Sequence, residues 1–304
     1  MYRGLARTIC LVTLPRICQL AVAEQDKSSS SRPRRLNPLC SSVCFSVCAV
    51  DGRYFSATRL LCLNQLSPMP TDRPTRQVLL IDADDTLWEN NIYFEEAIAG
   101  FIERLNHQHK SPQEVRLFLN DVERETILER GYGVHSFAHS LVKCFERLAE
   151  QPITPALHEY IWGFAHRIAS SPIELIHGVA ETLEYLQRGG HHLIMMTKGD
   201  ITEQSGKVER SGVKDYFAAV EIVPEKKPVA YKGVIEKYQL APQTTWMVGN
   251  SPRSDINPAM AAGINAVFVP HDNTWVLEHE EVDAVPHGVT LLQVQNFKEL
   301  RKHF

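Results

Sequence analysis

The sequence predicts an α/β protein in which a doubly wound parallel sheet carries an all-helical insert after its first strand. The first observation is the aliphatic run Val78–Ile81, which is typical of a strand buried on both faces of a parallel sheet. The second is a stretch of roughly 90 residues of helical periodicity that follows this strand. The third is a regular alternation of short apolar strands and helices from Gly178 onward, which indicates a parallel sheet with helices on both faces.

Residues 89–177 are expected to form a cap of four or so helices, because their apolar residues recur at helical spacing. The expected helical segments are 92–105, 115–127, 137–148 and 157–168. A glycine-bracketed loop around Tyr132 separates the second helix from the third. This loop is either a substrate contact from the cap or a plain turn. The remaining sheet domain comprises residues 69–88 and 178–304.

After the insert, short apolar segments alternate with amphipathic ones. The expected strands are 192–196, 219–223, 245–248 and 266–269. The expected helices are 179–186, 203–211, 231–238 and 255–262. Because the carboxyl ends of parallel strands gather at one edge of a sheet, the residues that follow each strand are expected to lie close together.

Three carboxylates, those of Asp82, Asp84 and Asp85, follow the first strand. Charges at the mouth of a buried strand are costly unless a positive group binds there. An acidic turn that caps the next helix is the plain alternative. Polar residues follow the later strands as well, namely Thr197, Lys198, Gly199, Lys226, Lys227, Asn250, Ser251 and Asp255. The sequence therefore predicts a polar site at this edge of the sheet, in which Asp85 has no catalytic role.

This combination of side chains is what phosphoryl transfer through a covalent aspartyl intermediate requires. Asp82 is the expected nucleophile. Asp84 is the expected general acid, which protonates the departing alcohol and then acts as base for the hydrolytic water. A lysine is expected to offset the negative charge, and Lys227 is preferred to Lys226 because a proline follows it. Lys207, on a helix, is a weaker candidate.

Thr197 and the backbone amides around Lys198 and Gly199 are expected to donate hydrogen bonds to phosphoryl oxygens. An anionic substrate would be repelled by an ionised Asp82, and Mg²⁺ held by oxygen ligands removes that repulsion. The expected metal ligands are Asp82, Asp84, Asn250 and Asp255.

With these motifs in order, the chain resembles the haloacid dehalogenase-like hydrolase superfamily. The matching positions are Asp82, Asp84, Thr86, Thr197, Lys227 and 249–255. The resemblance covers residues 77–290. It implies a Rossmann-like core, Mg²⁺ dependence and the helical-cap subgroup, which includes nucleotide and sugar-phosphate phosphatases.

Asn250 departs from the family pattern, which usually has aspartate after the glycine of the last motif. Asparagine can still bind Mg²⁺ through its amide oxygen, but it removes one negative charge. We expect weaker metal binding, with Asp255 as a compensating carboxylate. A degenerate and inactive site is the alternative.

The sequence thus predicts an Mg²⁺-dependent phosphomonoester hydrolase that acts on a small soluble metabolite. A haloacid dehalogenase of the same fold is one alternative, and Asp84 argues against it because that chemistry needs no acid at this position. A phosphosugar mutase is another. A non-catalytic sensor of a phosphate ligand is a third, motivated by Asn250. The net charge of -4 gives no reason to expect nucleic acid as a partner, and the sequence contains no apolar run of about 18 residues that would cross a membrane.

Residues 1–68 are expected to be an unstructured or spuriously translated extension, because they are rich in serine, arginine and proline. Met69 would then be a natural start. The basic, acid-poor beginning of the chain offers a targeting segment as the alternative. Without such targeting, we expect a cytoplasmic protein.

Overall fold

The computed structural model describes residues 8–14, 17–23, 76–149 and 151–304. The chain divides into two units, Met1–Thr71 and Asp72–Phe304. In the first unit, strands β1 (Thr8–Leu14) and β2 (Ile17–Ala23) pair in antiparallel fashion. The rest of the expectation for residues 1–68, and the proposed start at Met69, lie outside the described residues.

The second unit is built on a six-stranded parallel sheet with the order β5-β4-β3-β6-β7-β8. Its strands are β3 (Val78–Ile81), β4 (His192–Lys198), β5 (Ala219–Val223), β6 (Thr245–Gly249), β7 (Asn265–Phe268) and β8 (Leu291–Gln293). In the register, Ile81 of β3 lies beside Met195 of β4 and Val248 of β6. The run predicted as the first strand is therefore central in the sheet, between β4 and β6.

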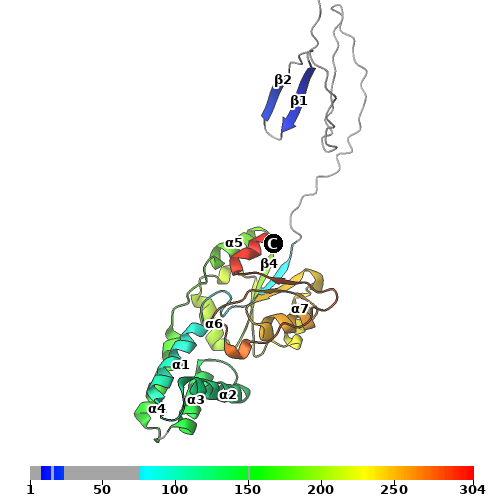
Figure 1. Ribbon diagram of the computed structural model, residues 1–304. Helices are drawn as coiled ribbons and strands as arrows, with labels where there is room; N and C mark the ends of the chain where they lie inside the picture. Colours follow the sequence, from blue (N-terminus) through cyan, green and yellow to red (C-terminus); the bar gives the residue numbers. More distant parts are fainter. Residues whose placement is uncertain (1–7, 15–16, 24–75, 150) are drawn as a thin grey trace, which may run out of the picture. The chain divides into compact units, whose positions relative to one another are not determined.

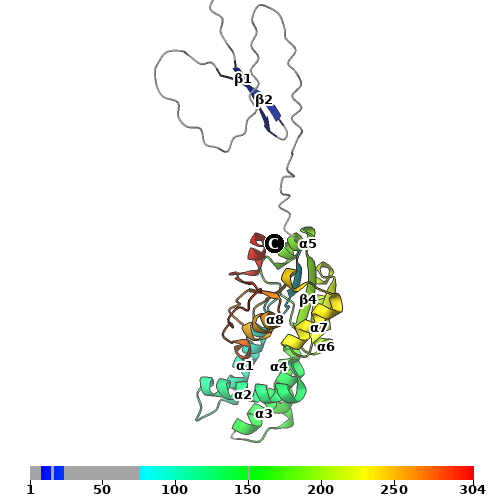
Figure 2. The same cartoon turned by 90° about the vertical axis from the view of Figure 1, so that its right-hand side faces the viewer.

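Helices cover both faces of this sheet, as the predicted doubly wound fold requires (Figures 1 and 2). The core helices are α5 (Val179–Arg188), α6 (Ile201–Arg210), α7 (Pro228–Tyr238), α8 (Asn257–Ala261) and the 3-10 helix η5 (Phe297–Lys302). Neighbouring residues of a strand point to opposite faces. Accordingly, Leu79 and Ile81 pack in a cluster with residues of α5, α6 and η5, and Leu80 packs in another with residues of α7 and α8. The predicted fold class is confirmed, with β8 as an additional strand.

The insert after β3 is all-helical, as predicted. It contains α1 (Asn91–Leu105), α2 (Pro112–Arg130), α3 (Val134–Leu148) and α4 (Pro155–Ser170). The four helices share one apolar core, which is separate from the clusters that pack on the sheet. Phe101, Leu119, Leu141 and Ile161 are all buried in it. These helices lie together at the end of the unit opposite to α5 and the C-terminus (Figures 1 and 2). Within the described ranges, no helix has both the length and the apolar character that a membrane crossing needs.

Candidate active site

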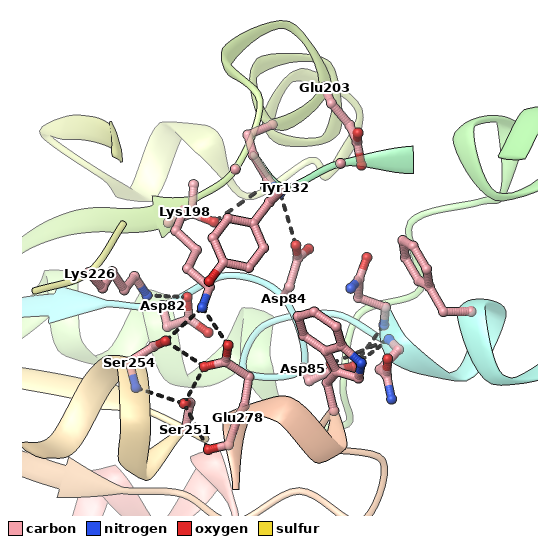
Figure 3. Close-up of a pocket in the computed structure, with 18 of the residues that line it drawn as sticks. Asp82, Asp84, Asp85, Tyr132, Lys198, Glu203, Lys226, Ser251, Ser254 and Glu278 are labelled. Carbon is pink, nitrogen blue, oxygen red and sulfur yellow. Dashed lines mark hydrogen bonds and ion pairs between the residues drawn. The ribbon is translucent and has the colours of Figure 1, made fainter. Parts of the chain in front are cut away.

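A cavity of about 150 Å³ lies at the carboxyl edge of the sheet and is roofed by the helical cap (Figure 3). The residues predicted for the site that line this cavity are Asp82, Asp84, Thr197, Lys198, Gly199, Asn250 and Asp255. Convergence of these residues follows from the parallel topology, because they lie at or just beyond the carboxyl ends of β3, β4 and β6.

Lys226, rather than Lys227, is the lysine of the site. Its Nζ donates to Oδ1 of Asp82 at 2.5 Å and to Oδ1 of Asp255 at 2.7 Å, and it is 3% exposed (Figure 3). Lys227 is exposed and is the N-cap residue of α7, ahead of Pro228. Consecutive residues in extended backbone face opposite sides, so only one of two adjacent lysines can point into the cavity. The sequence-based choice of Lys227 is corrected to Lys226.

Asp82 lies at the bottom of the cavity with both carboxylate oxygens engaged. Thr86 Oγ1 donates to its Oδ2 at 3.1 Å, while Lys226 donates to its Oδ1. Burial and the nearby Asp255 raise the pKa of Asp82 to about 7, although Lys226 acts in the opposite direction. An additional positive charge at this carboxylate would therefore favour its ionised, nucleophilic form.

Asp84 is held by donors from helix α6 and from its own loop. Trp88 Nε1 donates to Oδ1 at 2.8 Å, and Gln204 Nε2 and Lys207 Nζ each donate to Oδ2 at 3.0 Å. Burial acts to raise the pKa of Asp84, but Lys207 and the other donors outweigh it and bring the pKa below its ordinary value. The carboxylate form, a proton acceptor, is thus favoured. Lys207, the weaker candidate from the sequence, pairs with Asp84 and is distinct from the lysine at Asp82.

Asn250 presents its amide oxygen toward Asp82. Its Oδ1 accepts from Thr86 Oγ1 at 3.2 Å, and its Nδ2 donates to Thr274 Oγ1 at 2.9 Å. Thr86 therefore contacts oxygens of both Asp82 and Asn250. Two hard oxygen donors on one side of the cavity form a set that suits Mg²⁺.

Asp255 is less free to bind a metal, because its Oδ1 accepts from Lys226 and its Oδ2 accepts from the Ser251 amide at 3.0 Å. The whole cavity nevertheless favours a cation. Among the described lining residues there are seven carboxylates and three lysines, a formal charge of -4 when all are ionised. A dianionic phosphate would enter such a cavity only with a cation.

The comparisons with known proteins agree with this geometry. The family model of the haloacid dehalogenase-like hydrolases matches residues 77–263, more than half of the chain. The chain belongs to this hydrolase family. A haloacid dehalogenase-like hydrolase structure from Xanthomonas campestris is 27% identical, with a TM-score of 0.63, and the match covers 75% of this chain and 94% of that one.

Two curated relatives of this hydrolase are named as phosphatases. The phosphoglycolate phosphatase of Vibrio vulnificus is 36% identical over 90 residues, which are 28% of this chain and 39% of that enzyme. The chain thus matches about two fifths of the length of that relative. The glyceraldehyde 3-phosphate phosphatase of Pyrococcus furiosus is 23% identical over 222 residues, 71% of this chain and 90% of that enzyme.

The fold is also shared with dehalogenases. The L-2-haloacid dehalogenase of Xanthobacter autotrophicus is 14% identical, with a TM-score of 0.52, over 75% of this chain and 98% of that one. Fold similarity at this level does not separate carbon–halogen from phosphate chemistry, so the choice rests on the side chains of the cavity.

In this hydrolase, β4 ends in a tight polar turn. Thr197 is buried, and its Oγ1 lies 3.4 Å from Oε1 of Gln204. Gly199 has a φ of +142°, and an added Cβ would lie 3.1 Å from Nε2 of Gln204. A side chain at this position would press on Gln204, which also holds Asp84.

Glu278 is a site residue that the sequence did not predict. It accepts hydrogen bonds from Lys198 and Ser254, and from Ser251 at 2.6 Å (Figure 3). Burial acts to raise the pKa of Glu278, but Lys198 and the two serines outweigh it and lower the pKa. It holds Lys198 against the loop that follows β6. No motif spacing identifies Glu278, because it follows an irregular segment after β7.

Tyr132 of the cap loop contacts the core, so this loop is more than a plain turn. Its hydroxyl donates to Oε2 of Glu225 at 2.9 Å, and Lys198 Nζ lies 4.4 Å from the centre of its ring. Val134, the first residue of α3, donates its amide to Glu203 at 2.9 Å. Tyr132 also lines the cavity (Figure 3). The cap is therefore tied to the core beside the turn that ends β4.

Asp85, which is expected to take no part in catalysis, has a structural role at the start of α1. Its φ is 58°, and its Oδ1 accepts from the amides of Asn90 and Asn91 at the start of α1 at 2.9 and 3.0 Å. Asp85, Glu89 and His271 also bring ligand atoms within 4.8 Å of one another. The carboxylate of Asp85 is already committed to the start of the helix.

Gly249→Ala is expected to destabilise the protein by about 1–3 kcal/mol, because an added methyl group overpacks a filled site. The new Cβ would lie 2.2 Å from Oδ2 of Asp255, whose carboxylate also binds Lys226. Gly233→Ala on α7 is the matched control, since nothing lies within 4 Å of its added Cβ. Thermal unfolding of both variants measures the difference. Equal melting temperatures of the two variants would show that Asp255 can shift without loss of stability.

Proposed function

We propose that this hydrolase is an Mg²⁺-dependent phosphomonoester hydrolase that acts on a small phosphorylated metabolite through an aspartyl-phosphate intermediate. The observation that carries the proposal is a buried Asp82 held by Lys226 and Thr86, with the second carboxylate, Asp84, two residues on. A dehalogenase would need a nucleophile alone. An acid–base carboxylate beside the nucleophile is needed where an alkoxide must leave.

In the proposed reaction, a carboxylate oxygen of Asp82 attacks phosphorus and the bond to the ester oxygen breaks. Asp84, in its protonated form, supplies the proton that the departing alcohol takes, although its partners in the free protein favour the carboxylate. Water then attacks the phosphorus of the acyl phosphate, gives its proton to Asp84, and releases phosphate and the free Asp82. Lys226 and the donors after β4 hold the phosphoryl group and offset its charge. Mg²⁺ held by Asp82 and Asn250 would supply further positive charge at the phosphate.

The relatives support phosphate rather than halide as the released group, since both curated enzymes are named for phosphorylated small molecules. Release of inorganic phosphate from a panel of small phosphate esters, with Mg²⁺ and after its removal by chelation, tests the proposal. We expect turnover that chelation abolishes. Halide release from 2-haloacids without phosphate release would favour the dehalogenase alternative instead. Absence of both would contradict catalysis by this site.

Asn250→Asp is expected to lower the half-saturating Mg²⁺ concentration about tenfold, which corresponds to ~1.4 kcal/mol. The added negative charge would lie on the side of Asp82, where Oδ1 of Asn250 already points. A Mg²⁺ titration of phosphate release by the wild type and the variant measures the change. An unchanged midpoint would mean that Asn250 is not a ligand.

A further inference from the structure

The roof of the cavity, formed by cap helices, contains a single carboxylate among apolar, amide and hydroxyl side chains. The roof residues are Asn91 and Phe94 of α1, Glu123 and Ile127 of α2, and Ser136, Phe137 and Ser140 of α3. Glu123 is 5% exposed. Buried carboxylates are rare unless they are paired or bind something, so this side chain needs an explanation.

Part of the explanation is an arginine behind the roof. Arg116 lies about two turns before Glu123 on α2. Its Nη1 lies 3.3 Å from Oε2 of Glu123, and its Nη2 lies 2.6 Å from Oε1 of Glu95. Arg116 is not among the residues that line the cavity. A carboxylate offers about four acceptor positions. The ion pair with Arg116 therefore leaves Glu123 able to accept hydrogen bonds from a molecule in the cavity.

The cavity offers little to a second anionic group on the substrate. Within the described part of the chain, no Lys, Arg or His of the cap lines it. Its three lysines belong to the core, and each already faces a carboxylate. These pairs are Lys198 with Glu278, Lys207 with Asp84, and Lys226 with Asp82. A carboxylate on the leaving alcohol would approach Glu123 without a free cation to receive it.

The remaining roof surface suits a short carbon skeleton. Phe94 and Phe137 meet edge to face with ring centres 5.0 Å apart, and Ile127 lies one turn after Glu123 on α2. The cavity volume of about 150 Å³ is small for a ligand site. Because Glu123 already pairs with Arg116, which it shares with Glu95, we expect its remaining acceptor positions to take a neutral hydrogen-bond donor.

We propose, on the basis of the proposed function, that Glu123 determines specificity by accepting a hydrogen bond from a hydroxyl group of the leaving alcohol. The substrate class is then a small phosphate ester of a neutral, hydroxylated alcohol, and esters with a carboxylate at that end are rejected. This class differs from the substrate in the name of the Vibrio relative, whose alcohol carries a carboxylate.

The test compares two esters with the same two-carbon skeleton, 2-hydroxyethyl phosphate and 2-phosphoglycolate. Burial raises the pKa of Glu123 to about 7. The assays are therefore run near pH 8, where Glu123 is ionised. We expect the wild type to have a kcat/KM about tenfold or more higher for the hydroxyl ester. Glu123→Gln is expected to raise kcat/KM for 2-phosphoglycolate about tenfold, mainly through KM, because it removes the negative charge that the substrate carboxylate would face.

Asp121→Asn is the matched control, since it removes one negative charge from an exposed position of the same helix. This substitution should leave the ratio of kcat/KM for the two esters unchanged. A wild type that prefers 2-phosphoglycolate, or a ratio that Glu123→Gln leaves unchanged, would overturn the assignment of Glu123. Hydrolysis of p-nitrophenyl phosphate separates this failure from failure of the proposed function. If no ester is hydrolysed, calorimetric binding of the two esters to the Asp82→Asn protein decides, and preference for 2-phosphoglycolate overturns the inference.

Discussion

Asp82→Asn is expected to lower turnover of every phosphate ester by about four orders of magnitude or more, because it removes the attacking group of the reaction. The amide is nearly the same size as the carboxylate and can keep its contact with Thr86. Phosphate release under saturating Mg²⁺ measures the loss. Turnover that survives the substitution would contradict the covalent mechanism.

This loss is not expected to come from unfolding. The pKa of Asp82 is raised to about 7 in the folded chain, from 3.8. The folded state therefore holds the proton more tightly, and ionisation of Asp82 costs folding free energy as the pH rises through this range. Asparagine removes that cost, so the metal-free variant should melt no lower than the wild type near pH 8. A lower melting temperature would mean that the ion pair with Lys226 contributes more than burial takes away.

Asp85→Asn is the matched control for the nucleophile. Asp85 is an adjacent buried carboxylate whose pKa burial also raises to about 7. Asparagine tolerates its positive φ and can still cap α1. We expect less than about tenfold loss of turnover. Rapid quenching of the wild type with substrate should add the mass of one phosphoryl group to the peptide that contains Asp82, and the Asp82→Asn protein should not gain it.

The sequence was sufficient to predict the sheet and the edge at which the site lies. The aliphatic run of β3 and the strand–helix alternation after Gly178 both follow from burial on two faces. Asp82 and Asn250 then fall at neighbouring strand ends by topology alone. β8 escaped prediction because three residues, Leu291–Gln293, are too few for a pattern.

Other parts of the site depend on three-dimensional packing that no local pattern encodes. Glu278 follows a segment without regular structure, yet it closes on Lys198 and two serines. Glu123 is a polar residue of an amphipathic helix, and nothing in the sequence singles it out. Its burial depends on how α2 packs against α3, and the helical period does not encode that orientation.

Adjacent lysines give the clearest example. A proline is favoured in the first turn of a helix, and Pro228 is the first residue of α7, three residues before the helix start expected from the sequence. This preference does not say which of the two preceding side chains faces the cavity. Lys226 is buried and Lys227 is exposed, because the backbone between β5 and α7 is extended at the N-cap residue. Which of the two lysines enters the cavity therefore depends on the backbone conformation at a single position.

Lys226→Met is consequently expected to lower kcat/KM about 10²–10³-fold, since it removes a positioned cation from the nucleophile. It also leaves Asp82 and Asp255 facing each other without their shared partner. Removal of one member of a buried ion-pair cluster costs about 3–5 kcal/mol. The melting temperature should therefore fall, most strongly at high pH where both carboxylates are ionised, and Mg²⁺ should restore part of it by returning positive charge to Asp82.

Lys227→Met provides the contrast, because the same charge is removed from an exposed position one residue away. We expect kcat/KM within about twofold of the wild type and an unchanged melting temperature, as for most exposed substitutions. Assaying both variants well below their melting temperatures separates catalysis from folding. If Lys227→Met lost activity while Lys226→Met kept it, the lysine directly before the proline, Lys227, would be the functional one. Since only Lys226 of the two contacts Asp82, we expect Lys226→Met to lose activity and Lys227→Met to keep it.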